Sequence, residues 1–405
     1  MEFEEIFTYE NLYKSYRKCL KGVRWKGTVQ RFQIYSLSGL NQLLKEIKEE
    51  SFQSGNFFKF DIMERGKLRH IQSVGIRERI VQKSLCDYCL VPDLSKNFIY
   101  DNMACLKGKG VHKSYERMKD QLRKYYKKYK TNEGYILQFD FHHYFDTIPH
   151  DKLLYKIREH VPDDRVFKLI SRLVNDFEGD KGLGLGSQIS QISALFYPNE
   201  LDHKFIKTEG ITGYGRYMDD GYVISNNKEV LHYLAGLLKE ITDDLGIELN
   251  DNKTQISKLG RGFIYLKARF FLTKTGKVVM KFNRKNINRN RRKLKKLFNK
   301  GKSLQIIDDF VKIIVGNMSH FDSYHTTQNF LKLYEKEKEK MLQHVHPYID
   351  EKGTAHEDLV KTYSDEGLKI MQVETGLIFE DVVDCYPCKF TYKEVKEPEE
   401  EVAEA

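Results

Sequence analysis

Three carboxylates occur where the pattern of the chain predicts that strands end. Asp140 closes the alternating run YILQFD, which predicts a strand. Asp219 and Asp220 lie between two β-rich runs within residues 211–227, a pattern that predicts a hairpin with an acidic turn. Carboxylate oxygens gathered at strand ends suit Mg²⁺, and two such ions about 3.5–4 Å apart can stabilise both oxygens of an in-line phosphoryl transfer. A lone strand-end aspartate is usually only solvated, so this prediction depends on all three.

The elements that must position these residues follow from hydrophobic periodicity. The segment 231–250 after the hairpin predicts an amphipathic helix that ends at Gly246, and a basic helix over 113–130 precedes the first strand. The glycine-rich segment 182–191 (GLGLGSQISQ) is expected to be a loop. The other predicted elements are an amphipathic helix over 36–50, a strand pair or extended arm over 67–76, a helix from about 77 that stops before Pro92, helices across 151–178, a helix over 192–205, two strands joined by a Lys-Thr-Gly turn over 262–282, and helices to about residue 340.

Composition indicates a folded, aromatic-rich protein. The 405 residues include 25 Phe, 25 Tyr and only 7 Pro, which excludes collagen-like and wholly disordered classes. The formal charge is +10, and residues 393–405 hold six Glu and two Lys, so the rest of the chain carries 10 − (−4) = +14, which suits phosphate backbones. No run approaches the roughly 18 apolar residues of a membrane span, and six cysteines are too few for a disulfide scaffold. A cytoplasmic location without membrane contact is expected.

Five sequence blocks occur in order around the three carboxylates. They are LQFDFHHYFDTIPHDKLL, GLGLGSQISQISALFYPNELD, GRYMDDGYVIS, LNDNKTQI and GFIYLK. Together they resemble the reverse transcriptases, specifically the prokaryotic branch that includes group II intron, retron and diversity-generating retroelement enzymes, over roughly residues 60–300. YMDD alone is a weak match, whereas YMDD preceded by an FD…YFD block and a GxxxS loop is highly specific.

The resemblance implies an α+β fold and a prokaryotic or phage origin. The fold is a right-hand polymerase with fingers, a palm made of an antiparallel sheet with packed helices, and a helical thumb. The implied divisions are an N-terminal helical extension (1–60), fingers (61–134), palm (135–265, with a fingers segment at 150–185), thumb (266–345) and an acidic, partly disordered C-terminal extension (346–405). The implied activity is RNA-directed DNA polymerisation, a nucleotidyl transfer that makes cDNA from RNA.

The resemblance also assigns the reacting groups. It implies that Asp140, Asp219, Asp220 and the backbone at Phe141 hold two Mg²⁺ ions, with Mn²⁺ as a substitute. Lys253 matches the family lysine near the leaving pyrophosphate, where a cation can neutralise charge or donate a proton. A solvated surface lysine is the plainer interpretation of Lys253.

Residues around the incoming nucleotide are implied in the same way. Phe145 lies five residues after the first aspartate, at the family position under the incoming sugar, so its ring is expected to exclude a 2′-hydroxyl and select dNTPs. An ordinary core phenylalanine is the alternative. Arg69 and Arg77 match basic residues of the fingers that clamp the triphosphate, with the template backbone as the alternative partner of either.

The GxxxS loop distinguishes subtypes. Gly186, Ser190 and Gln191 give GxxxSQ, whereas most reverse transcriptases have Pro after the Ser. GxxxSQ resembles the enzymes of diversity-generating retroelements, which make cDNA with errors at template adenines. An anti-phage defence-associated reverse transcriptase, with templated or template-independent synthesis, stays open as an alternative. So does an inactive palm that serves as an RNA-binding scaffold.

A basic run over residues 281–302 contains eleven Lys or Arg and no acid. It lies where the family has a thumb helix, so Arg291, Arg292 and Lys293 are expected to contact the template–primer backbone, with a solvated helix face as the alternative. The implied partners are an RNA template, a DNA or RNA primer and dNTPs. A small basic accessory protein is a further candidate.

Two other groups have metal-ligand residue types. The pairs Cys86/Cys89 and Cys385/Cys388 have the two-residue spacing of zinc ligands but stand almost 300 residues apart. Because the first pair falls in an apolar helix, buried thiols are the favoured interpretation. The neighbouring histidines 142 and 143 are expected to be basic surface.

Overall fold

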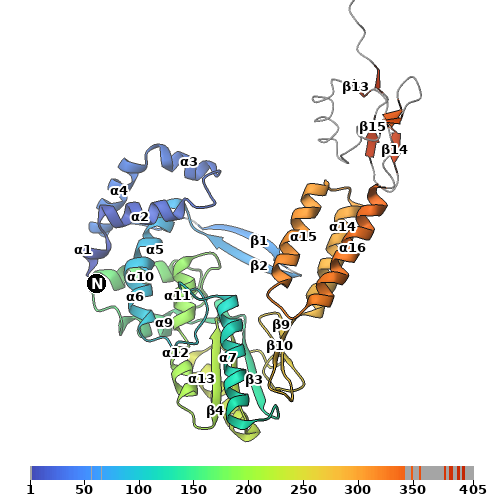
Figure 1. Cartoon of the computed structure of the whole chain (residues 1–405). Coiled ribbons are helices and arrows are strands. Elements are labelled where there is room, and N and C mark those ends of the chain that lie inside the picture. The colour runs from blue at the N-terminus through green and yellow to red at the C-terminus, as the bar shows by residue number, and fades with distance from the viewer. Residues whose placement is uncertain are drawn as a thin grey trace, which may run out of the picture. The chain divides into compact units, whose positions relative to one another are not determined.

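A computed structural model divides the chain into two compact units, whose elements Figure 1 labels. One unit comprises residues 1–263 and 272–278, and the other comprises residues 264–271 and 279–405. The structure describes residues 2–55, 57–64 and 66–342, together with six short C-terminal strands. These strands pair as β11 (Tyr348–Ile349) with β12 (Ala355–His356), β13 (Ile378–Phe379) with β16 (Val395–Lys396), and β14 (Val383–Cys385) with β15 (Phe390–Tyr392). The expected disorder within 346–405 otherwise lies outside the described residues.

The first unit contains a five-stranded antiparallel sheet. Its order is β4-β5-β3-β6, and β7 also pairs with β3. The strands are β3 (Tyr135–His142), β4 (Ile211–Tyr217), β5 (Asp220–Ser225), β6 (Glu248–Leu249) and β7 (Gln255–Lys258). Strand β3 runs two residues beyond the predicted end at Asp140, because Phe141 and His142 pair with β6.

Three helices pack against this sheet, namely α7 (Val111–Tyr129), α12 (Asn199–Ile206) and α13 (Lys228–Leu245). Helix α13 buries Leu231, Leu234 and Leu238 at the three-to-four spacing of one helix face. It ends as predicted at Gly246, whose φ of 71° is left-handed and costs glycine little. The basic helix predicted over 113–130 is α7 and begins two residues earlier.

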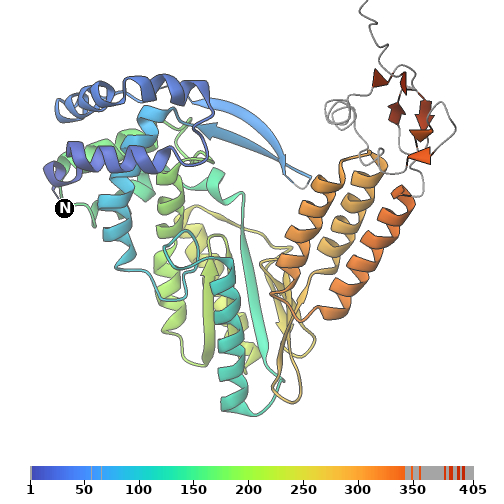
Figure 2. The ribbon, with the colours of Figure 1, turned by 45° about the horizontal axis from the view of Figure 1, so that its top comes forward.

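A two-stranded ribbon precedes the strands of this sheet in the sequence. The strand pair predicted within 67–76 is a longer hairpin, in which β1 (Phe58–Glu64) pairs with β2 (Lys67–Ser73). Figure 2 shows this ribbon projecting from the helices of its unit. Five of its apolar side chains are exposed, namely Phe58, Phe60, Ile62, Met63 and Leu68.

The helix expected to stop before Pro92 continues through it. Helix α5 (Ile76–Leu85) passes into a π-helical turn (Cys86–Leu90) and then into α6 (Val91–Ser95). The Val91 N–H bonds to the Cys86 carbonyl five residues back, and Pro92 falls in the first turn of α6. Proline has no N–H to continue the i→i−4 pattern, and the π-helical turn directly before it breaks that pattern already, so the helix can pass this residue.

The segment after β3 is helical, with two differences from the prediction. Its helices are α8 (Tyr144–Thr147), α9 (His150–Arg158), α10 (Asp164–Asn175) and α11 (Gln188–Phe196). The helix predicted over 192–205 is two helices, α11 and α12, separated at Tyr197 and Pro198. The glycine-rich loop ends at Ser187, so Gln191 lies in the first turn of α11 and not in the loop.

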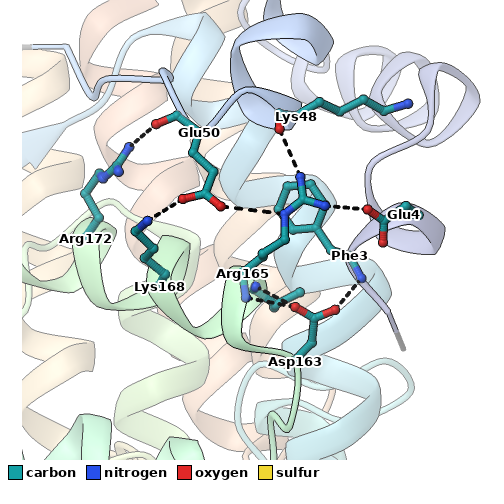
Figure 3. A network of polar contacts seen from close by, with 9 residues as sticks. Phe3, Glu4, Lys48, Glu50, Asp163, Arg165, Lys168 and Arg172 are labelled. Atoms are coloured by element: carbon teal, nitrogen blue, oxygen red, sulfur yellow. Dashed lines mark hydrogen bonds and ion pairs between the residues drawn. The ribbon is translucent and has the colours of Figure 1, made fainter.

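Four helices form the N-terminal region, and the first and the fourth of them attach to α10. They are α1 (Phe3–Ile6), α2 (Tyr9–Cys19), α3 (Gly27–Ile34) and α4 (Ser36–Lys48). Figure 3 shows the polar network that links them: Arg165 of α10 pairs with Glu4 and Glu50 and donates to the Lys48 carbonyl, while Asp163 accepts from the Phe3 N–H at 2.8 Å. The N-terminal extension is thus part of the same folded unit.

The strands expected over 262–282 number three. They are β8 (Phe263–Tyr265), β9 (Ala268–Leu272) and β10 (Val278–Phe282), in the order β10-β9-β8. The extra turn lies at Leu266 and Lys267, both left-handed, with φ of 45° and 70°. Turns with left-handed residues usually contain Gly, Asn or Asp, and this one contains none of them. The sequence therefore gives no signal for the turn.

In the part of the second unit that the structure describes, the helices are α14 (Arg284–Asn299), α15 (Leu304–Met318) and α16 (Tyr324–Leu342). Their shared core includes Leu294, Phe298, Ile307 and Phe330. The predicted α+β fold is therefore confirmed: an antiparallel sheet with packed helices is followed in sequence by a helical bundle. Among the described residues, no helix combines the length and the apolar character needed to cross a lipid bilayer.

Candidate active site

The register of the sheet brings the three carboxylates together. Asp140 of β3 and Asp220 of β5 are direct cross-strand partners. Asp219 lies in the tight turn between β4 and β5, beside Met218, whose φ of 58° is left-handed. Asp140 is 4% exposed. We call Asp219 and Asp220 the acidic turn.

Gly221, the residue after the acidic turn, packs directly against the ring of Phe139. A Cβ at Gly221 would lie 2.1 Å from the Phe139 ring, far inside contact distance. Phe139 is the cross-strand partner of Gly221 and is buried. Any larger side chain would push β5 away from β3, and with it the acidic turn from Asp140.

The carboxylates perturb one another. Burial, followed by the charges of Asp219 and Asp140, raises the pKa of Asp220 to about 7. Burial and the charge of Asp140 also raise the pKa of Asp219, while Lys253 and Arg69 act against this shift. Like charges in a poorly solvated place produce this behaviour, and a nearby cation relieves it.

Lys253 is the ammonium group within this cluster. Its Nζ donates to Asp140 Oδ2 at 2.7 Å, and the same oxygen accepts from Asn250 Nδ2 at 3.2 Å. Although burial opposes it, the hydrogen bond to Asp140 and the charges of Asp220 and Asp219 raise the pKa of Lys253, so the side chain stays charged. Sequence reasoning found Lys253 but missed Asn250, three residues before it in the same block.

A buried ion pair supports the acidic turn and was also missed. Arg216 donates from Nε and Nη2 to the two carboxylate oxygens of Asp202 at 2.7 and 2.6 Å, and both side chains are fully buried. The same guanidinium donates to the carbonyls of Met218, in the turn, and Leu195, in α11, each at 2.9 Å. The available signal was Arg216, the one charged residue in the strand before YMDD.

The predicted nucleotide-binding residues are placed as follows. Phe141 is buried in β3, and Phe145 is half-buried in α8, where its carbonyl accepts from the Leu183 N–H at 2.6 Å. Arg69 lies on β2 and is one of the cations that lower the pKa of Asp219. Arg77, by contrast, pairs with Glu46 of α4.

The glycine loop contacts the β1–β2 ribbon. The Gln72 N–H bonds to the Leu185 carbonyl at 3.1 Å, next to Gly186. Beyond the loop, Ser190 is buried and Gln191 is exposed on α11. The loop, the ribbon and the start of α11 therefore form one connected region of the first unit.

Three predicted template–primer residues lie on α14 in the second unit. Arg291 and Arg292 line a cavity of about 440 Å³ between α14 and α16. Lys293 instead lies over the Phe310 ring of α15, 4.9 Å from its centroid. The basic run is thus a helix that presents cations on more than one side.

The cysteine pairs and histidines do not form a metal site in the described residues. Cys86 and Cys89 are buried in the π-helical turn, and burial raises the pKa of Cys86 strongly and that of Cys89 to about 12. Such thiols stay protonated and inert. The side chains of Cys385 and Cys388 lie outside the described residues. His142 and His143 are exposed, as predicted.

The carboxylate cluster fits a divalent cation in donor type and in charge. All donors are oxygens, and burial together with the neighbouring carboxylates raises the pKa values of two of the three groups, so a cation there would be stabilising. Within the described ranges, no three His, Cys, Asp or Glu side chains already surround one point. Ligation therefore requires these side chains to reorient, and Asp140 is at present engaged by Lys253.

A second polar chain leads from α5 to the start of α11. Ser187 Oγ donates to Gln82 Oε1 at 2.8 Å, and Gln82 Nε2 donates to Glu78 Oε1 at 2.9 Å. Burial, with the charge of Asp176, raises the pKa of Glu78 to about 7. Glu78 Oε2 and Asp176 Oδ2 are buried, and neither has a hydrogen-bond partner within the ranges that the structure describes.

Glu78 should make stability depend on pH. Its ordinary pKa is 4.5, so the folded chain retains a proton that the unfolded chain loses between about pH 4.5 and 7. The resulting stabilisation is full below this window and is lost as pH rises through about 7. Glu78→Gln should be more stable than wild type at pH 8 by up to about 3 kcal/mol, as measured by urea unfolding at pH 5 and pH 8. An unchanged pH dependence in the variant would contradict this.

The family model described as reverse transcriptase (RNA-dependent DNA polymerase) matches residues 59–278, just over half of the chain. An apo telomerase from Candida tropicalis, truncated from the C-terminal domain, is 15% identical with a TM-score of 0.44, over 55% of this chain and 54% of that one. Telomerase from Candida albicans in complex with a TWJ fragment of telomeric RNA is 11% identical with a TM-score of 0.46, over 73% of this chain and 63% of that one. No curated protein matches the sequence.

Proposed function

Because the chain belongs to the reverse transcriptase (RNA-dependent DNA polymerase) family, we propose that it is an active RNA-directed DNA polymerase. The observation that supports activity most directly is the cluster of Asp140, Asp219 and Asp220 with Lys253. A chain that had kept the fold only as a scaffold would have no need for carboxylates that destabilise one another. The reaction is attack of a primer 3′-oxygen on the α-phosphorus of a dNTP, with loss of pyrophosphate.

Reverse transcriptase domains generally use divalent metal ions, and we assign Mg²⁺ to the three aspartates and the Phe141 backbone. When bound, the ions neutralise phosphate charge and acidify the primer hydroxyl. The aspartates supply oxygen ligands on a rigid sheet, and Arg216 fixes the turn that carries two of them. Mn²⁺, which also prefers oxygen ligands, is a reasonable substitute.

Lys253 and Arg69 supply positive charge from the protein. Both lower the pKa of Asp219, so both are electrostatically close to the acidic turn. Lys253 is assigned to the leaving pyrophosphate, where it can donate a proton or neutralise charge. Arg69 is assigned to the triphosphate. Arg77 stays a weaker candidate, because Glu46 already neutralises it.

The direct test is primer extension on a defined RNA. Purified protein, a primer annealed to RNA and dNTPs should give full-length cDNA with Mg²⁺ and none with excess EDTA. RNA binding should be measured in the same samples. Binding without any extension, under either Mg²⁺ or Mn²⁺, would contradict the polymerase assignment and favour the scaffold.

Phe145 is assigned to sugar selection. Phe145→Ala should raise the efficiency of rNTP incorporation relative to dNTP by opening the space for a 2′-hydroxyl. Because Phe145 is only half-buried, the loss of stability should stay below the roughly 3–5 kcal/mol typical of buried rings. Phe167→Ala, another half-buried ring of the first unit, is the matched control. An rNTP-to-dNTP ratio equal in both variants would remove Phe145 from the sugar site.

The subtype we propose is the error-prone enzyme of a diversity-generating retroelement, and its support is Gln191. In the first turn of α11 an exposed glutamine amide can both donate and accept hydrogen bonds. A discrimination loss of about 1.4 kcal/mol is enough to raise the error rate tenfold. A small accessory protein and a prokaryotic or phage source belong to this same proposal.

We expect wild type to misincorporate often opposite template adenine and Gln191→Ala to do so less. Alanine suits a helix turn, so this substitution removes the amide without disturbing α11, whereas proline would delete the N–H that faces Ser187 four residues back. The measurement is cDNA sequencing from one defined RNA, with errors at G, C and U as internal controls. Low, adenine-independent error in wild type would favour the defence-associated alternative.

Basic residues of α14 are assigned to the backbone of the template–primer. Arg291, Arg292 and Lys293 belong to a helix with no acidic residue along its length. Duplex contacts of this kind each contribute about −0.9 to the slope of log affinity against log salt. The DNA or RNA primer paired to template is the duplex concerned.

A further inference from the structure

Besides the cavity between α14 and α16, the first unit has a cavity of its own, which has a cationic lining and no role in the reaction proposed above. It has a volume of about 270 Å³ and lies where α2, α5 and the start of α11 meet. Its lining includes Lys18, Arg79, Gln82, Lys83, Gly186 and Gln188. Sites for drug-sized ligands usually measure roughly 300–1,000 Å³, so this one suits a group smaller than a whole nucleotide.

The charge of this cavity is positive. Lys18 and Lys83 share one acid, Asp87, at 2.7 and 2.6 Å. Arg79 donates to Ser73 Oγ at 3.3 Å and has no acidic partner among the residues that the structure describes. Three cations against one carboxylate leave a net charge of +2. The excess charge is suited to one phosphate group.

The three cations line one cavity and have a shared neighbour there, the thiol of Cys19. Cys19 also lines the cavity. Burial raises the pKa of Cys19 to about 11, while Arg79, Lys83 and Lys18 all act against that rise. Cations that share one neighbour in this way can share one anion.

The start of α11 adds backbone donors. Ser187 occupies the N-cap position, where a serine side chain normally accepts from an amide of the first turn. Here Ser187 Oγ donates to Gln82 instead and makes no capping bond. The first-turn N–H groups of α11 are thus left without that side-chain cap, at the positive end of the helix dipole. This is an arrangement that favours anions.

The cavity is distinct from the acidic turn. The cations that lower the pKa of Asp219 are Lys253 and Arg69, and none of the cavity residues is among them. The contact of α11 with Arg216 is through Leu195, near the opposite end of the helix from Gln188. A phosphate at the cavity is therefore not the phosphate that reacts.

We propose that this cavity, the phosphate pocket, binds a backbone phosphate of the single-stranded RNA template. The template assignment rests on the proposed polymerase function, since template is the phosphate-bearing partner that must extend beyond the reacting nucleotide. The shared chemistry, a phosphate group, is also present in dNTPs and pyrophosphate. The experiment separates these sources.

The test measures binding of a labelled single-stranded RNA by fluorescence anisotropy across a series of salt concentrations. Arg79→Gln keeps most of the side-chain stem and can still donate to Ser73, and Lys83→Gln leaves Asp87 paired with Lys18. Each variant should weaken RNA binding about tenfold and flatten the slope of log affinity against log salt by about 0.7, the value for one single-strand contact. Arg17→Gln is the matched control, because Arg17 lies on α2 beside Lys18 and does not line the pocket.

Three outcomes would overturn the proposal. Arg79→Gln and Lys83→Gln could match Arg17→Gln in affinity and slope while thermal unfolding shows all of them folded. They could instead raise the KM for dNTPs without affecting RNA binding, or RNA could be displaced from wild type and Arg79→Gln equally well by inorganic pyrophosphate. Because RNA binding needs no synthesis, a chain that binds RNA through Arg79 but makes no DNA would remove the proposed function and retain the pocket.

Discussion

The double variant Asp219→Asn/Asp220→Asn is expected to lose dNTP incorporation altogether while it keeps the fold and RNA binding. Both side chains are acids whose pKa values are raised by burial and by the charge of Asp140. Removing two negative charges from this cluster relieves repulsion, so the free energy of unfolding should hold or rise. Primer extension and urea unfolding on the same preparation measure the two effects. An active double variant would show that the acidic turn is not the active site.

Asp146→Asn is the matched control for this experiment. Asp146 belongs to the same sequence block as Asp140, but it is an exposed carboxylate that pairs with His143 at 3.4 Å. Loss of the Asp146 charge should leave primer extension unchanged. It should lower the free energy of unfolding by no more than an exposed ion pair contributes, about 1 kcal/mol or less. If Asp146→Asn also abolished extension, loss of negative charge in the block as a whole would be the better explanation.

Asp202→Asn is expected to have the largest effect on stability. It would leave the Arg216 guanidinium buried without its counter-charge, a change that typically costs about 3–5 kcal/mol. The exposed pair Arg158–Asp164 offers a matched comparison, since Asp164→Asn should cost less than about 1 kcal/mol. If both variants lost the same free energy of unfolding, burial of the Arg216–Asp202 pair would not explain the cost. Urea unfolding measures both.

The hydrophobic double variant Arg216→Met/Asp202→Leu separates stability from positioning. Replacing a buried ion pair by apolar residues of similar volume is often neutral for stability. This variant nevertheless lacks the guanidinium that holds the Met218 carbonyl, so extension should stay impaired, with a lower kcat at little-changed template affinity. Full activity in a stable double variant would show that Arg216 serves the fold alone.

Local patterns predicted most of the elements that position the site. The acidic hairpin, the helix ended by Gly246 and the basic helix α7 follow from alternation, three-to-four periodicity and capping chemistry, which act within a few residues. The residues Asp140, Asp219 and Asp220 could likewise be named from the sequence blocks. Their proximity to Lys253 then followed from the pairing of β3 with its neighbours.

The structure differs from the sequence-based prediction where contacts between residues far apart in the chain determine the local conformation. The sequence predicted that the helix ends before Pro92, because proline disfavours helical backbone in the residue before it. In the structure a π-helical turn leads into α6, and the helix continues through Pro92. The boundary between loop and α11 depends on Ser187, whose hydroxyl is taken by Gln82 more than a hundred residues away. The partner of Arg216 is a helix residue, Asp202, that no spacing pattern links to the strand. Such pairings are properties of the tertiary structure.

Helix α11 joins two sites through a single rigid element. One end borders the phosphate pocket, and the other gives its Leu195 carbonyl to the guanidinium that also holds the acidic turn. Nine residues at about 1.5 Å each make a spacer of about 13 Å. Neither end can shift against the other without breaking a buried hydrogen bond. Thermodynamic linkage then requires reciprocity: whatever free energy the occupied pocket contributes to ordering the acidic turn, an ordered turn returns as tighter binding at the pocket.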